Sequence, residues 1–203
     1  MNTKQMDMFM KHCDRYFEQT DCTVLHPVAE GPYHVDVLLY KPTEKYPFWK
    51  LVTMGASDYK MPKVQNTIAM RNEYIMFVDK DEDLTDRETA LWYHQKLMGV
   101  AMFAYAQKTH ITYSHSFEWE NDDPADEMIA AFIEFPQIIP DAGILRCKLG
   151  LFNTTACLQV VLLNKAELEK LMQIGPQAFS EFLYPEEDGK MHYLSQRVRD
   201  EKF

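Results

Sequence analysis

Three short extended segments, each bounded by turn residues, most strongly constrain what this chain can fold into. Residues 34–40 (HVDVLLY), 48–54 (FWKLVTM) and 73–78 (EYIMFV) are rich in β-branched and aromatic side chains. This pattern predicts neighbouring strands of one sheet. The flanking turn residues are Gly31-Pro32, Pro42-Thr43 and Gly55-Ala56-Ser57-Asp58. Further extended segments are expected at residues 111–119, 128–135 and 156–163.

Helical signals alternate with these segments. Apolar residues within residues 6–17 recur at spacings of three and four, which predicts an amphipathic helix. A capping box at residues 85–88, with Thr85 and Glu88 as its partners, predicts a second helix that runs to about Gln107. A third helix opens at residues 164–167, and Gly175-Pro176 separates it from a fourth.

Together these elements predict a single-domain α+β fold, in which helices pack on a mixed, largely antiparallel sheet. The chain has 203 residues, of which 46% are hydrophobic, so it can bury a substantial core. We expect the domain to span residues 1–184. The charged tail, residues 185–203, offers little to bury.

The charge balance bears on the choice of partner. With 31 acidic and 21 basic residues, the chain carries a formal net charge of −10. This charge opposes binding to nucleic acid and to anionic membranes and favours a basic protein surface. Ordinary soluble proteins also carry such a charge, so it does not by itself identify a partner.

The cysteines and the N-terminal residues suggest a location. Cys13, Cys22, Cys147 and Cys157 form no CxxC pair and no metal-type spacing, so we interpret them as reduced thiols. Residues 1–17 lack the apolar run of a signal peptide, and no later stretch has the length of a membrane span. The expected location is the cytoplasm.

The turn at residues 53–58 is the densest candidate for catalysis, because it resembles half of a G-x-S-x-G nucleophile elbow. Tyr59 stands where the second glycine would be, which favours a structural turn closed by the side chains of Ser57 and Asp58. The alternative is a hydrolase with Ser57 as nucleophile. Its base would be His34 or His115, and its aspartate Asp36 or Asp58.

Neither a metal nor a cofactor site is complete in the sequence. His34 with Asp36, or His110 with His115, could each supply two metal ligands, but neither pair brings a third. The acidic run at residues 79–83 lacks the glycine and glutamate of a calcium loop, and a solvated loop explains it. The chain has no glycine-rich phosphate loop. We therefore expect no metal, no cofactor and no catalytic residues.

In their order and spacing, the central motifs resemble the suppressor-of-fused domain. The resemblance covers about residues 23–184. Its motifs are His34-Val35-Asp36-Val37, the loop at residues 41–48, residues 51–58 followed by Met61, Arg71-Asn72-Glu73-Tyr74, the helix containing Trp92, Ser114-His115-Ser116, and the passage at residues 162–171. The Ser114-His115-Ser116 match is looser, because family members more often carry a glycine or aspartate near that histidine.

The resemblance implies an α+β domain without catalytic activity that binds a protein partner. Animal members have a second domain and grip an extended peptide as an added strand. This chain looks more like the compact bacterial members, which have been proposed as immunity proteins that neutralise toxins of competing cells. The resemblance thus implies a toxin encoded by a neighbouring gene as partner, with a peptide-binding regulatory scaffold as the alternative.

Two sets of residues follow from this reasoning. The first carries the family signature and is expected to maintain the turn rather than contact a partner: Asp36, Thr53, Gly55, Ser57, Asp58, Met61, Arg71 and Glu73. The second is predicted to contact the partner and lies mostly in two acidic segments: Asp81, Glu82, Asp83, His115, Glu118 and Glu120.

Overall fold

The computed structural model describes residues 1–27, 31–64, 69–151, 153–184 and 192–199. The helices are α1 (Thr3–Phe17), α2 (Arg87–Ala106), α3 (Lys165–Ile174) and α4 (Pro176–Leu183), with short 3-10 helices η1 (Ala56–Asp58) and η2 (Ala142–Leu145). The strands are β1 (Cys22–Leu25), β2 (Asp36–Tyr40), β3 (Phe48–Met54), β4 (Asn72–Asp79), β5 (Ser116–Glu118), β6 (Ala130–Glu134), β7 (Arg146–Lys148) and β8 (Thr154–Leu163).

The strands form one sheet in the order β1-β2-β3-β4-β8-β6-β5, and β7 pairs with β8 beside this path. β4 and β8 run parallel, whereas the other pairs are antiparallel. Among the residues that the structure describes, β1 and β5 therefore lie at the two ends of this strand order. The mixed, largely antiparallel sheet and the α+β class that the sequence predicts are both confirmed.

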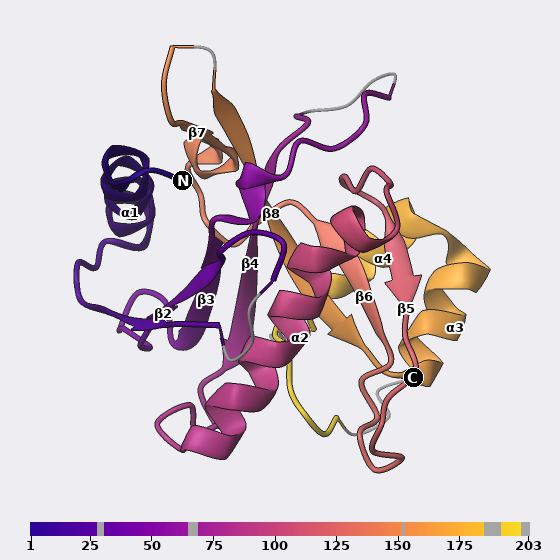
Figure 1. Cartoon of the computed structure of the whole chain (residues 1–203). Helices are drawn as coiled ribbons and strands as arrows, with labels where there is room; N and C mark the ends of the chain where they lie inside the picture. Colours follow the sequence, from indigo (N-terminus) through magenta and orange to yellow (C-terminus); the bar gives the residue numbers. More distant parts are fainter. Residues whose placement is uncertain (28–30, 65–68, 152, 185–191, 200–203) are drawn as a thin grey trace.

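Helices cover both faces of the sheet. One face packs against α2, with Val37 and Leu39 of β2 in that cluster. The other packs against α1, α3 and α4, with Leu38 and Tyr40 of the same strand. Figure 1 shows α2 crossing one face of the sheet. Because successive side chains of a strand point to opposite faces, the central strands are buried on both sides.

Some predicted elements differ from those observed. The extended segment expected at residues 111–119 contains only the three residues of β5, and neither β1 nor β7 was predicted. The capping box expected at Thr85 is wrong, because Asp86 is the N-cap of α2 and its side chain accepts a hydrogen bond from the Thr89 amide. A single position separates two good capping residues here, and the local turn decides between them.

The segment at residues 192–199 buries more than the sequence predicts. Ser195 is fully buried, its amide donates to the Phe77 carbonyl at 2.8 Å, and its carbonyl accepts from the Asp79 amide at 3.2 Å. Arg199 forms a buried ion pair with Glu167 of α3. Ser195 and Arg199 of this segment thus contribute to the core. The division into a domain of residues 1–184 and a tail stays a prediction.

The capping box of α3 provides a first test. Asn164 accepts from the Glu167 amide at 2.9 Å, and the Glu167 side chain accepts from the Asn164 amide at 3.0 Å. We expect Asn164→Ala to lower the free energy of unfolding by about 1 kcal/mol, because an N-terminal amide loses its acceptor. Urea unfolding measures this effect. Lys165→Ala, at the adjacent exposed position, is the control, and equal midpoints for the two variants would contradict the prediction.

Among the described residues, none of the helices combines the length and apolar character needed to cross a membrane.

Candidate protein-binding site

The family-signature residues converge on one buried carboxylate. Glu73 of β4 is fully buried and accepts from the Thr53 hydroxyl at 2.6 Å. It also accepts from three successive amides, of Gly55, Ala56 and Ser57, at 3.0 to 3.1 Å. Burial raises the pKa of Glu73, and these hydrogen bonds oppose the rise. The turn is therefore closed by Glu73 of the neighbouring strand, not by the side chains of Ser57 and Asp58 as the sequence suggested.

Three further signature residues contact this turn or the chain beside it: Asp58, Met61 and Arg71. Asp36, which was also expected to maintain the turn, instead bonds to His34. Arg71 donates to the carbonyls of Ser57 and Asp58, at 2.5 and 3.0 Å. The Asp58 carboxylate pairs with the N-terminal amine of Met1. The buried sulfur of Met61 accepts from the Ile111 amide at 3.4 Å. These contacts hold η1 against the ends of β3 and β4.

Ser57 lacks the surroundings of a nucleophile. It is 3% exposed, and its amide and hydroxyl both interact with Glu73. His34 and Asp36, proposed as its base and aspartate, bond to each other at 2.8 Å. Because a nucleophilic serine needs a base within hydrogen-bond reach and an open approach, this geometry does not support the hydrolase hypothesis.

The predicted partner-contacting residues lie in two places. Asp81, Glu82 and Asp83 belong to the loop between β4 and α2. The Glu82 carboxylate accepts from the Arg197 amide at 2.9 Å, and Asp83 accepts from the Thr85 amide and hydroxyl. The hydrogen bonds from Thr85 lower the pKa of Asp83. Glu82 and Asp83 therefore form hydrogen bonds within the chain, whereas Asp81 is exposed to solvent.

The other predicted contact residues lie along the β5 edge, where His115, Glu118 and Glu120 are exposed. The His115 carbonyl accepts from the Ile133 amide at 2.8 Å, and the Trp119 amide donates to the Ile129 carbonyl at 2.9 Å. In an antiparallel ladder, such residues alternate with residues whose main-chain groups point away from the partner strand. Ser116 and Glu118 therefore direct their amides and carbonyls outward, along the open edge of the sheet.

A groove of about 400 Å³ lies beside this edge, between α2 and the loop that follows β5. We call it the aromatic–acidic groove, and its lining includes Trp92, Lys96, Phe103, Phe117, Trp119, Glu120, Asp122, Asp123 and Asp126. The Phe103 and Phe117 rings stack with centroids 4.0 Å apart. The groove thus combines apolar ring faces with an acidic rim.

Lys96 fixes the shape of the aromatic–acidic groove. Its ammonium group pairs with Asp126 at 2.7 Å, and it donates to the Asn121 side chain at 2.7 Å and to the Met128 carbonyl at 3.0 Å. It also lies over the rings of Trp92 and Trp119, at 5.2 and 5.1 Å from their centroids. One cation thus ties the loop to α2, so the groove is formed before any partner binds.

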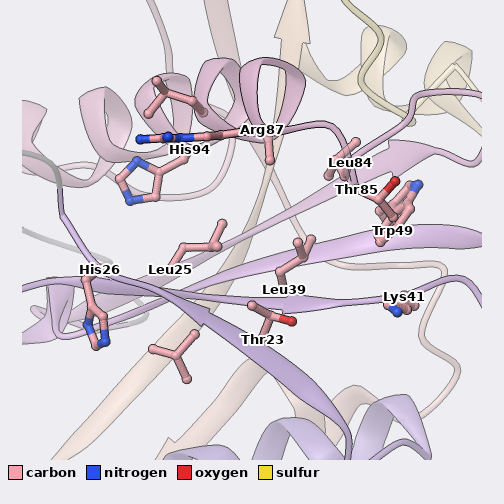
Figure 2. A pocket seen from close by; sticks show the side chains of 13 residues that line it. Thr23, Leu25, His26, Leu39, Lys41, Trp49, Leu84, Thr85, Arg87 and His94 are labelled. Carbon is pink, nitrogen blue, oxygen red and sulfur yellow. The ribbon is translucent and has the colours of Figure 1, made fainter.

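A second pocket, of about 580 Å³, lies between the β1 edge and the N-terminal half of α2. In Figure 2, Leu25 and Leu39 point from the strands toward α2, which carries Arg87 and His94, whereas His26 points away from it. Burial lowers the pKa of His94, so its neutral form is favoured. Neither ring nitrogen of His94 bonds to any part of the chain that the structure describes.

Sequence reasoning missed both pockets. Trp92, Lys96 and Phe103 share one helix face because they are spaced by four and seven residues. The sequence, however, gives no sign that Lys96 pairs with a loop 25 to 30 residues later. The one available signal was the run of five acidic residues beside Phe117 and Trp119 at residues 117–126.

Comparison with solved structures identifies the fold. A chain of the Sufu-Fu complex has a TM-score of 0.67 at 11% identity, covering 97% of this chain and 91% of that one. A suppressor of fused homologue from Neisseria gonorrhoeae has a TM-score of 0.66 at 11% identity, covering 98% and 97%. Drosophila Suppressor of Fused has a TM-score of 0.64 at 13% identity, and the match covers 95% of this chain but 48% of that protein.

A comparison with curated proteins finds no match. The family model of the suppressor of fused protein (SUFU), however, matches residues 31–195. This range contains every signature residue, from Asp36 to Glu73, and extends to the buried Ser195. The chain therefore belongs to the suppressor of fused family.

Proposed function

We propose that this chain is a non-enzymatic protein-binding module that holds an extended partner segment along β5. The observation that supports this proposal is the open β5 edge, which lies directly beside a preformed groove. Outward main-chain groups of Ser116 and Glu118 would supply the hydrogen bonds of an added strand. The aromatic–acidic groove would take side chains of that segment, with aromatic or aliphatic groups on the rings and basic groups on the rim.

The acidic character of the groove supports a basic partner. Glu120 and Asp122 are exposed at its rim, whereas Lys96, a cation within it, is already paired with Asp126. A net charge of −10 adds long-range attraction for a basic protein. The pocket beside β1 is the alternative docking place, since it too adjoins a sheet edge.

The finer proposal is that the partner is a toxin whose gene lies next to that of this chain, and that the chain neutralises it by stoichiometric binding in the cytoplasm. The overall charge and the family membership support this proposal. Co-purification with the products of the neighbouring genes tests it. A stable complex that abolishes the partner's activity is expected, and failure of every neighbouring product to bind would contradict the toxin proposal.

Binding along β5 can be tested by removing one outward main-chain amide of that strand. Ser116→Pro removes an outward amide. It removes no ladder bond to β6, because the Ser116 amide points away from that strand, and proline is tolerated at such edge positions. We expect the partner affinity to fall at least tenfold, as measured by calorimetry. Ser116→Ala keeps the amide and is the control, with an affinity near that of the unaltered chain. Equal affinities for the two variants would exclude strand addition at β5.

Reversing the acidic charges at the rim of the aromatic–acidic groove tests whether the partner binds there. We expect Glu120→Lys with Asp122→Lys to weaken binding at least tenfold at low salt, with a smaller effect at high salt. Glu169→Lys with Glu181→Lys makes the same change in net charge on exposed positions of α3 and α4. If both double variants weaken binding equally, net charge alone would be responsible and the groove would not be the contact.

A further inference from the structure

A cluster of two histidines and one aspartate lies where β1 meets β2. Asp36 is 4% exposed at its side chain, and its Oδ1 atom bonds to Nδ1 of His26 and to Nε2 of His34, both at 2.8 Å. The three ligand atoms all lie within 4.8 Å of one another. The sequence had supplied two of these groups, His34 and Asp36. The third comes from a different strand end.

The strand register brings the three side chains together. Residues 34 and 36 lie two apart in an extended segment, so their side chains point to the same face. β1 pairs with β2 so that Leu25 lies opposite Val37, and continuing this register places His26 opposite Asp36. Opposite residues of an antiparallel pair also share a face. The cluster is therefore fixed by main-chain pairing rather than by chance side-chain contact.

The chemistry of this set matches a metal ion. Two imidazole nitrogens and one carboxylate oxygen are ligands that Zn²⁺ and neighbouring divalent ions prefer. Metal–ligand bonds of about 2.0 to 2.2 Å in a tetrahedron place ligand atoms about 3.3 Å apart, so each imidazole must withdraw from Asp36 by about 0.5 Å. The side chains of His26 and His34 are 73% and 63% exposed and can make this movement.

We propose that His26, His34 and Asp36 form a binding site for a divalent transition-metal ion of the Zn²⁺ type. The buried aspartate is the fixed ligand, and the two exposed imidazoles close over the ion from solvent. Three protein ligands leave a fourth tetrahedral position for water or for a donor atom of another molecule. This site lies at the β1 end of the sheet and is independent of the proposed partner site at β5, the opposite edge.

Metal titration of the full chain tests the proposal. After treatment with a chelator, the protein is titrated with Co²⁺ and its absorption spectrum recorded, and Zn²⁺ affinity is measured by competition. We expect one ion per chain with visible d–d bands and no thiolate charge-transfer band. A charge-transfer band would assign the ion to a cysteine and overturn the proposal.

Two variants locate the site. We expect His26→Ala and His34→Ala each to weaken Zn²⁺ binding at least tenfold. His115→Ala is the matched control, since it removes an exposed histidine outside the cluster and should leave the affinity unchanged. Because both ligand histidines are exposed, the variants should unfold at nearly the same denaturant concentration as the unaltered chain. Unchanged Zn²⁺ affinity in the His26→Ala/His34→Ala double variant would overturn the proposal.

Discussion

Replacing Gly55 with alanine is expected to lower the free energy of unfolding by at least about 3 kcal/mol. Gly55 has a φ of 122°, a conformation that residues with a Cβ atom rarely adopt. A Cβ atom there would lie 2.3 Å from the His34 carbonyl oxygen and 3.2 Å from the Val35 Cα atom. Both are main-chain atoms of the two residues that precede β2, and main-chain atoms move aside less readily than the end of a flexible side chain. Chemical denaturation measures the loss.

Gly99 provides the matched control for this prediction. It lies within α2, and a Cβ atom added there meets nothing within 4 Å. We expect Gly99→Ala to stabilise the protein by up to about 1 kcal/mol, because alanine restricts the unfolded chain and favours the helix. The two glycine substitutions should thus shift the unfolding midpoint in opposite directions. A Gly55→Ala variant as stable as the unaltered chain would show that the turn adapts to a side chain.

Replacing Glu73 with alanine is expected to cost about 3 to 5 kcal/mol of unfolding free energy. The substitution leaves the Thr53 hydroxyl and the amides of Gly55, Ala56 and Ser57 without their acceptor in a buried place. Water could replace the carboxylate only by entering a closed part of the core. Urea unfolding with a folded-state spectrum at low denaturant measures the effect and shows whether the variant folds.

A graded series separates the hydrogen bonds of Glu73 from its size. Glu73→Gln keeps the shape and one acceptor oxygen but turns an amide group toward the donors, so we expect an intermediate loss. Glu169→Ala, on an exposed position of α3, should change stability by less than about 0.5 kcal/mol. If Glu73→Ala were no more destabilising than Glu169→Ala, the carboxylate would not organise the turn.

The sequence predicted the signature motif well but not the reason for it. Thr53, Gly55 and Ser57 were recognised as a turn, and Glu73 as part of a strand start. Only the pairing of β4 with β3 shows that these residues form one hydrogen-bonded turn. The Glu73 acceptor lies 16 to 20 residues after its donors in the sequence. Local turn chemistry had offered Ser57 and Asp58 as the closing side chains, since a single sequence favours near partners over distant ones.

The histidines illustrate the same limit. His34 and Asp36 share a strand face by alternation, which is a local property that sequence reasoning can use. His26 joins them only through the register of β1 on β2. That register was out of reach because β1 is four residues long and has no alternating apolar pattern. The burial of Arg199 was not predicted for a similar reason, since it depends on Glu167 of α3.

By itself, the sequence determined the α+β class, the long helices and the central strands, because hydrophobic periodicity and turn residues act over a few positions. It also determined the family, through motifs whose order is kept along the chain. Only the tertiary structure decided the sheet order, the edges left open at β1 and β5, and the side chains gathered beside them. Those features depend on contacts between distant segments, where many pairings fit the same local pattern and packing selects one.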